Sequence, residues 1–354
     1  MISVSDEPED TEYGSYGLDQ CLDLVRDALA RGNGVAVPEG DDWLAGQGIA
    51  MAMHDTAPPT EHRSDARLSV GADGNYHLAV GTAEFGNGTT TLHGQVVASL
   101  LETTMSRVRM VQADTDRTGN DTGAFASTGT TVAGNAVRLA AEALRERILD
   151  FASAHSGASR DACRLEDGAV SCNGSRIPLP ELLAAAQAAG QQLEVVRKAY
   201  GAPRSVAFNV QGFRIAVHRV TGEIVILQSV HAADAGVVIN PMQLRAQVEG
   251  SVAQGLGWAL YERMVFDEEG RVVNPTFRNY RIPAFADVPR TKVFFADTHD
   301  AVGPLGAKGM GECPINPVSP ALANALADAT GVRFRDPPFT PDRIYRRILA
   351  RHAD

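Results

Sequence analysis

Three glycine-rich segments contain the residues of this sequence that could carry chemistry. The richest is GPLGAKGMGECP, residues 303–314, which has four glycines within nine residues and a single carboxylate, Glu312. Glycines form a wall without side chains, and a carboxylate in such a pocket would lose water and could serve as a general base. The alternative is a solvated loop glutamate, and this segment by itself leaves both open. Lys308 is not followed by Ser or Thr, so the segment is not a phosphate-binding P-loop.

Two further segments combine glycine with small polar residues. Residues 81–89, GTAEFGNGT, contain Gly86 and Gly88, which would let the backbone approach a ligand at a strand-to-helix turn. A third glycine is missing at the position that a dinucleotide-binding fingerprint needs, and a plain tight turn is the competing interpretation. Residues 122–129, TGAFASTG, offer hydroxyl groups and N–H donors ahead of a helix, with an ordinary loop as the alternative.

The cysteines do not indicate a metal site. Cys21, Cys163, Cys172 and Cys313 have a spacing that fits neither a zinc nor an iron–sulfur pattern. Cys163 and Cys172 flank a hairpin with a two-residue Asp-Gly turn, and counting outward from the turn places them opposite each other as a non-hydrogen-bonded pair. We expect both to be free thiols, because a reducing cytoplasm is the expected location.

Periodicity and capping residues predict the elements that must position these segments. Apolar residues recur at helical spacing over residues 18–30 and 135–151. Asn240-Pro241 supplies the N-cap and first residue of a helix that runs to about Glu262. Three glycines inside that helix predict close packing against backbone or a ligand. The other predicted elements are strands at 76–83, 213–220 and 223–234, a hairpin at 163–172, helices at 93–111 and 180–190, and two helices that begin at Ser319-Pro320 and Thr340-Pro341.

Composition and charge bound the class of protein. The chain has 354 residues, 44% of them hydrophobic and 21% charged, which is typical of a soluble globular protein. A net charge of −11 without a basic stripe argues against nucleic acid and anionic membranes as partners. The acidic N-terminus is not a signal peptide, and no apolar run approaches the length of a membrane span.

Strands and helices do not alternate as regular βαβ units, which predicts an α+β fold. We expect a flexible arm over residues 1–16 and two mixed α/β lobes. The first lobe would cover residues 17–199, and the second, with Glu312, residues 200–354.

Five blocks occur in a fixed order along the chain: GTAEFGNGTTTLHGQVVASLL, DTDRTGNDTGAFASTGTTVAGNAV, DAGVVINPMQLRAQVEGSVAQGLGWALYE, NYRIPAFADVP and GPLGAKGMGECPINPVSPALANAL. Together they resemble the molybdenum-binding part of the xanthine dehydrogenase/aldehyde oxidase family. The resemblance extends from about residue 15 to the C-terminus. An ordered set of blocks is more specific than any single motif.

The resemblance implies roles for particular residues. Glu312 in GMGE matches the catalytic base, and Gln247 in AQVEG matches a glutamine near the metal. Asn87 stands where many members of the family have glutamine. No side chain is expected to bind the metal directly, because molybdenum is held through the pterin. The expected cofactor-binding residues are Phe85, Gly86, Asn87, Ala124, Phe125, Ala126, Ser127, Thr128, Gln247, Gly309 and Gly311.

The resemblance also implies an activity and a set of cofactors. The expected enzyme hydroxylates an electron-poor carbon of an N-heterocycle, purine-like or nicotinate-like, or an aldehyde, with water as the oxygen source. The expected cofactor is molybdopterin with molybdenum, in the cytosine dinucleotide form.

The family's molybdenum subunit is considerably longer, and its N-terminal half carries a Phe-Gly-Gly cofactor loop that is not found here. The chain therefore resembles the C-terminal half seen in split-subunit hydroxylases such as nicotinate dehydrogenases. Its expected partners are an N-terminal-half molybdenum subunit, a [2Fe–2S] subunit and an FAD subunit. The competing hypothesis is a non-catalytic paralogue that binds cofactor or scaffolds a complex, against which the intact Glu312 and Gln247 argue.

Overall fold

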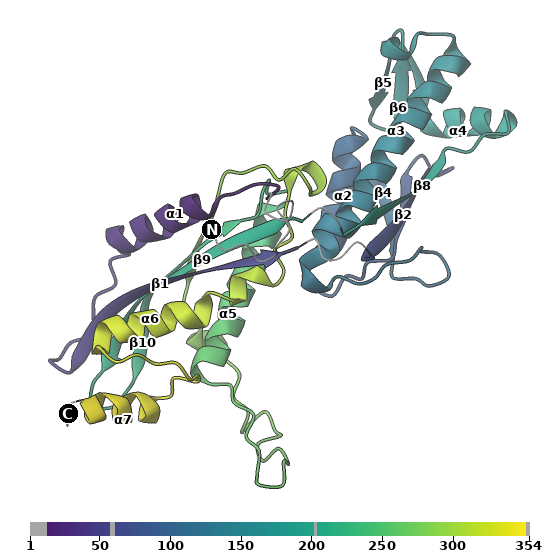
Figure 1. The fold of residues 1–354 in the computed structure, drawn as a ribbon. Coiled ribbons are helices and arrows are strands. Elements are labelled where there is room, and N and C mark those ends of the chain that lie inside the picture. The colour runs from purple at the N-terminus through teal and green to yellow at the C-terminus, as the bar shows by residue number, and fades with distance from the viewer. Residues whose placement is uncertain (1–12, 57–60, 202–203, 352–354) are drawn as a thin grey trace, which may run out of the picture. The chain divides into compact units, whose positions relative to one another are not determined.

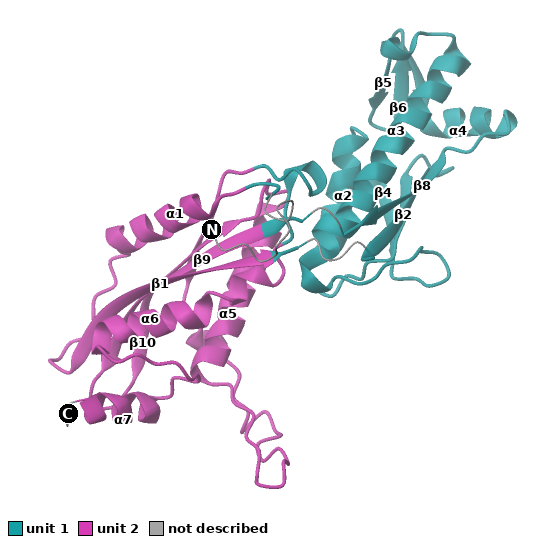
Figure 2. Cartoon of the chain, viewed as in Figure 1, with its two compact units in different colours: residues 1–15, 55–206, 299–309 teal, residues 16–54, 207–298, 310–354 magenta. Residues whose placement is uncertain are grey.

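The computed structural model describes residues 13–56, 61–201 and 204–351, which fold into two compact units (Figures 1 and 2). Of the described residues, unit 1 comprises 13–15, 55–56, 61–201, 204–206 and 299–309, and unit 2 comprises 16–54, 207–298 and 310–351. The units therefore differ from the continuous lobes expected from the sequence. Residues 16–54 give unit 2 a helix and a strand, and residues 299–309 return to unit 1. Residues 1–12 of the expected arm lie outside the described residues.

Unit 2 is built on a four-stranded mixed sheet with helices on both faces (Figure 1). Its order is β1 (Trp43–Asp55), β9 (Val206–His218), β10 (Ile224–Asp234) and β11 (Thr291–Phe295). Strands β9 and β10 are antiparallel, and β10 and β11 are parallel. One face packs on α1 (Leu18–Arg31), and the other packs on α5 (Pro241–Leu260), α6 (Val318–Thr330) and α7 (Pro341–Arg351). Almost every residue of β9 is buried, because this interior strand is covered on both faces.

Unit 1 contains a second four-stranded sheet, ordered β4 (Val108–Gln112), β3 (Tyr76–Val80), β2 (Arg63–Val70) and β8 (Glu194–Tyr200). Helices α2 (Thr89–Leu100) and α3 (Gly134–Ser156) pack on this sheet and on each other. A small antiparallel sheet follows, made of β5 (Cys163–Glu166), β6 (Ala169–Cys172) and β7 (Ser175–Pro178), with α4 (Leu179–Ala188) after it. The short helical turns are Met105–Arg107, Phe125–Ser127, Gly129–Ala133, Arg160–Ala162, Phe285–Asp287, Pro304–Gly306 and Cys313–Ile315.

The α+β fold class is confirmed, and most predicted helices are present. Asn240 caps α5 as expected, since its Oδ1 accepts a hydrogen bond from Gln243 N at 3.1 Å. The helix predicted over 93–111 is wrong in its second half, because α2 ends at Leu100 and residues 108–112 form β4. Glu102 has φ 49°, in the left-handed region, where the chain leaves the helix. No strand was predicted before residue 76, but this part of the chain contains β1 and β2.

Glycines allow one helix to lie directly on an edge strand in unit 2. A Cβ added to Gly48 of β1 would come within 2.2 Å of Ala325 N, and one on Gly46 within 2.4 Å of Ala329 N, both on α6. Close packing was also predicted for the glycines of α5. It holds for Gly255, where a Cβ would lie 2.6 Å from Val318 Cβ, but Gly250 faces open space.

The predicted pairing of Cys163 with Cys172 across the β5–β6 hairpin is confirmed, with a Cα–Cα distance of 4.2 Å. The prediction of free thiols is wrong, because the two residues form a disulfide. The side chains of a directly opposed strand pair are close enough to be joined. No helix among the described residues is long and apolar enough to cross a membrane. No group of three or more metal-binding side chains occurs among those same residues.

Candidate cofactor and catalytic site

The glycine-rich segment of residues 81–89 forms the turn between β3 and α2 in unit 1. The carboxylate of Glu84 accepts hydrogen bonds from the backbone N–H groups of Gly86, Gly88 and Thr90 at 2.7, 3.1 and 3.0 Å. Partial burial acts to raise the pKa of Glu84, but these backbone hydrogen bonds outweigh it and hold the pKa below its usual value. Glu84 was not identified from the sequence, although an acidic residue at a helix N-terminus is a recognisable signal.

Phe85, Gly86 and Asn87 lie at the tip of this turn. The Phe85 side chain is 71% exposed. Gly86 has φ 99°, and a Cβ added there would meet no atom within 4 Å, so its surroundings leave room for a ligand. Asn87 takes part in the turn itself, since its Oδ1 accepts a hydrogen bond from Thr89 N at 3.3 Å. The turn is thus held together internally and presents an aromatic ring beside an open backbone.

The second segment, residues 122–129, is a compact loop with unusual backbone geometry. Ala126 and Ser127 have φ values of 54° and 61°, which residues with a Cβ seldom adopt. Thr128 Oγ1 lies 3.0 Å from both Gly123 O and Phe125 O and thereby closes the loop. Strained backbone of this kind clusters at ligand-binding sites, because the surrounding structure must maintain it.

Two buried histidines of unit 1 contact the 122–129 loop. Neither was predicted from the sequence to be a site residue. His62 Nε2 lies 2.8 Å from Gly123 O and 3.0 Å from Thr128 Oγ1. Its ring packs edge-on against Phe125, whose side chain is 57% exposed. His93 Nε2 lies 3.1 Å from Gly129 O, and full burial lowers the pKa of His93. A neutral His93 then carries its proton on Nε2 and donates it to this carbonyl.

Gly309, in the glycine-rich segment of residues 303–314, packs against the loop of residues 122–129 in unit 1. A Cβ added to Gly309 would come within 2.1 Å of Ser127 O and 2.9 Å of Thr56 Cβ. The absence of a side chain at position 309 is therefore required by the backbone of the 122–129 loop. Gly309 and Ser127 are thus in direct contact, and their binding of a cofactor stays a prediction.

Gly309→Ala is expected to lower the stability of unit 1 by about 1–3 kcal/mol, since the backbone at Ser127 must move to admit a methyl group. Differential scanning calorimetry would measure the loss, and hydrogen exchange should show faster exchange over residues 122–129. Gly250→Ala is the matched control: it adds a methyl in open space on α5 and should gain up to about 1 kcal/mol. Unchanged unfolding and exchange in Gly309→Ala would show that the loop does not depend on this packing.

Glu312 lies in unit 2 between two buried anchors. Met310 and Cys313 are buried with Ala207, Ala233 and Val248, so the backbone on either side of Glu312 is fixed. Of the two alternatives that the sequence left open for Glu312, the structure favours the solvated carboxylate, because its side chain is 50% exposed and Gly311 is exposed as well. The buried residues on either side therefore fix the backbone of Glu312, but none of the described glycines encloses its carboxylate.

Gln247 is a half-buried residue on α5 in the same unit. The next residue, Val248, belongs to the apolar cluster that contains Met310 and Cys313, and α5 packs against the turn Cys313–Ile315. Gln247 and Glu312 therefore lie on adjoining elements of unit 2. The other expected cofactor residues belong to unit 1, except for the exposed Gly311.

A buried polar network lies beneath Met310 in unit 2. Asn209 Nδ2 donates to Met310 Sδ at 3.2 Å, and Asn209 Oδ1 lies 2.8 Å from His231 Nε2. His231 Nδ1 lies 2.9 Å from Gln211 Oε1, and Gln211 Nε2 donates to Ser229 Oγ at 3.1 Å. Burial lowers the pKa of His231 to about 3. His231 is therefore neutral at neutral pH and donates a hydrogen bond from only one of these two ring nitrogens. The network anchors Met310, two positions before Glu312.

Acidification is expected to destabilise unit 2 through His231. Its pKa is about 3 when folded and about 6.5 when unfolded, so between these values the unfolded chain binds more protons and stability falls as the pH falls. The loss between pH 7 and pH 5 should be about 2 kcal/mol. Urea unfolding followed by tryptophan fluorescence would measure it, because Trp43 and Trp258 both belong to unit 2. His231→Gln should start less stable but lose less on acidification, whereas equal losses in both proteins would count against His231 as the source.

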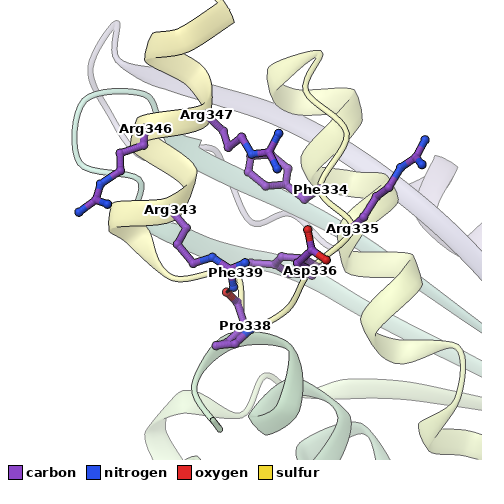
Figure 3. Close-up of a pocket in the computed structure, with 8 residues that line it drawn as sticks. All are labelled: Phe334, Arg335, Asp336, Pro338, Phe339, Arg343, Arg346 and Arg347. Carbon is purple, nitrogen blue, oxygen red and sulfur yellow. Dashed lines mark hydrogen bonds between the residues drawn. The ribbon is translucent and has the colours of Figure 1, made fainter. Parts of the chain in front are cut away.

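The hollow between residues 334–339 and α7 in unit 2 contains none of the expected site residues (Figure 3). It has a volume of about 250 Å³, and four arginines contribute to its lining. Arg343 Nη1 donates to Pro338 O at 2.7 Å, so one of the four is tied to the wall of the hollow. The lining residues are Phe334, Arg335, Asp336, Pro338, Phe339, Arg343, Arg346 and Arg347.

Comparison with known proteins connects these loops to a single family. The profile described as "Molybdopterin cofactor-binding domain" matches residues 28–289. The chain is 31% identical over 347 residues to the putative xanthine dehydrogenase molybdenum-binding subunit XdhA of Escherichia coli (strain K12), covering 94% of this chain and 46% of that protein. It is 30% identical over 311 residues to the probable hypoxanthine oxidase XdhD of the same organism, covering 87% of this chain and 32% of that protein.

A solved structure is also similar to this chain. Quinoline 2-oxidoreductase from Pseudomonas putida 86 matches with a TM-score of 0.80 and 25% identity, covering 94% of this chain and 44% of that one. The chain thus spans less than half the length of each of these three relatives.

Proposed function

Because the chain belongs to the molybdopterin cofactor-binding domain family of xanthine dehydrogenase/aldehyde oxidase-type proteins, we propose that it forms the C-terminal part of the cofactor-binding subunit of a molybdenum hydroxylase. The observation that carries this proposal is the family match over residues 28–289 together with the packing of Gly309 against Ser127. Two of the ordered sequence blocks that resemble the family meet at that contact.

The described residues of unit 1 fit a flat, polar ligand such as a pterin. Phe85 and Phe125 expose aromatic rings, and Gly86 leaves open space at its backbone. Ala126 and Ser127 hold a strained conformation that redirects backbone groups of the second loop. We therefore assign cofactor binding in unit 1 to residues 85–87, 124–128 and Gly309, and we propose Gly311 and Gln247 of unit 2 as cofactor-binding residues on the family resemblance alone. When bound, the molybdenum cofactor, proposed in its cytosine dinucleotide form, supplies the two-electron oxidation chemistry.

Glu312 is the proposed general base. Its carboxylate would accept a proton as an oxygen atom derived from water is transferred to an electron-poor carbon of the substrate. The buried flanks Met310 and Cys313 keep the backbone of Glu312 in one place, which is what orientation of a base requires. Gln247, in the N-terminal half of α5, is proposed as a polar contact to the cofactor.

The substrate class proposed here is an N-heterocycle, purine-like or nicotinate-like. Support comes from the names of the relatives, which include a hypoxanthine oxidase, a xanthine dehydrogenase subunit and a quinoline oxidoreductase. An aldehyde is the alternative substrate. Because the chain covers 32–46% of these three relatives, we propose that the rest of the cofactor cradle and the [2Fe–2S] and FAD centres are supplied by further polypeptide.

The test is affinity purification of the chain with its co-eluting proteins from a host that makes the cofactor. Molybdenum would be measured by plasma mass spectrometry, and turnover of hypoxanthine, nicotinate, quinoline and benzaldehyde would be followed in ¹⁸O-labelled water. Molybdenum with ¹⁸O-labelled heterocycle product supports the proposal. Molybdenum without turnover of any substrate favours a non-catalytic paralogue, and a complex without molybdenum would exclude the cofactor-binding role.

A further inference from the structure

A histidine lies beside the proposed base in unit 2. His54 Nε2 is 3.2 Å from Glu312 Oε2, although the two residues are far apart in sequence. His54 is the next-to-last residue of β1, and its side chain is 25% exposed. This histidine is not part of any of the glycine-rich segments and was not singled out from the sequence.

Backbone packing explains why the two side chains meet. Cys313, which follows Glu312, points its Sγ at Ala207 O of β9 at 3.5 Å and lies 4.0 Å from Ala52 O of β1. Ala52 is two residues before His54 on the same strand, and β1 and β9 are neighbours in the sheet. The backbone of Glu312 is therefore held over the end of β1 by a buried neighbour, which keeps its side chain within reach of His54.

The buried Nε2 atom of His54 gives a second reason to pair His54 with Glu312. Its Nε2 is inaccessible to solvent and has no well-aligned hydrogen bond among the described residues, although the carboxylate oxygen is within reach. A buried nitrogen left without a hydrogen-bond partner destabilises the folded chain. A small rotation of the half-exposed Glu312 carboxylate would align the bond and remove that cost.

We propose that His54 is a positioning residue for Glu312. It donates a hydrogen bond from Nε2–H to the carboxylate and so fixes one rotamer of the base. The inference rests on the proposed function of Glu312, but the contact itself can be tested without any turnover. His54 is not a catalytic residue on this view, because it acts on the reaction only through Glu312.

The direct test uses the chain with ¹⁵N-labelled histidine. The NMR signal of His54 Nε2, assigned by its loss in His54→Gln, should move when Glu312 is replaced by Gln. It should stay in place in Met53→Leu, a control on the same strand. A His54 signal that is indifferent to Glu312→Gln would overturn the inference, whether or not the complex is a hydroxylase.

The kinetic test uses the assembled complex. His54→Leu should lower kcat about 10-fold or more with KM changed by no more than about threefold, because the base is mispositioned while binding is kept. His54→Gln keeps an N–H donor at a similar reach and should recover most of this loss. Equal loss in the Leu and Gln variants together with lost molybdenum would indicate a merely structural role and would overturn the assignment, as would wild-type kcat in His54→Leu.

Discussion

Glu312→Gln should leave the molybdenum content of the assembled complex close to that of the wild type and lower kcat by about 10²–10⁴-fold. Glutamine keeps the shape of the side chain and removes its ability to take a proton. The fold around it should persist, because the buried residues Met310 and Cys313 anchor the segment and Glu312 is itself half exposed. Rapid-mixing measurement of cofactor reduction by substrate would isolate the affected step.

The matched control is Glu249→Gln. Glu249 lies on α5 of the same unit and forms a surface ion pair with Arg245 at 2.8 Å. Such exposed pairs contribute little to stability, about 1 kcal/mol at most, and neither residue belongs to the proposed site. Its turnover should match the wild type. If Glu312→Gln turned over at the wild-type rate with full molybdenum, the base would have to be sought elsewhere.

Local signals explain which parts of the fold could be predicted. The cap Asn240 and the residue Pro241 fix the start of α5, and Thr340 directly precedes α7, which begins at Pro341. The register of Cys163 and Cys172 followed from the position of the two-residue turn. Each of these features depends on residues a few positions apart, so the chain itself contains the information.

Long-range packing explains what could not be predicted. Strand β1 was missed because its burial pattern does not alternate and its glycines are needed only where α6 lies on it. The partner of Gly309 is the backbone of Ser127, and the partner of Glu312 is His54, so neither contact leaves a trace in the neighbouring sequence. Residues 16–54 join unit 2 for the same reason, since strand β1 pairs with β9.

The sequence predicted the turns of the candidate site but not what surrounds them. The glycine-rich segments do form turns with positive φ at Gly86 and Gly123. The glycine neighbours of Glu312 left open whether its carboxylate is enclosed or solvated, because glycine removes bulk without supplying a cover, and its side chain is half exposed. Side chains from another part of the structure would have to cover Glu312, and the amino-acid composition of its loop does not predict which ones.

When expressed by itself in a host that makes the cofactor, the chain is expected to retain no stoichiometric molybdenum and to turn nothing over. The relatives XdhA and XdhD contain more than twice the length that it matches, 46% and 32% being covered. In this chain, Phe85, Phe125 and Glu312 are all at least half exposed. A cradle open to water neither pairs the polar groups of a pterin nor excludes solvent from the reaction.

Co-expression with the polypeptide that carries the preceding half of such a subunit should restore both molybdenum and turnover. The surface between them should be large and apolar, above about 2,000 Å² in total, as in obligate complexes. Co-expressed Glu312→Gln separates the two properties, because it should regain molybdenum without regaining activity. A stable monomer of this chain with near-stoichiometric molybdenum and hydroxylase activity would instead mean that these exposed loops suffice to hold the cofactor, and that no second half of the cradle is needed.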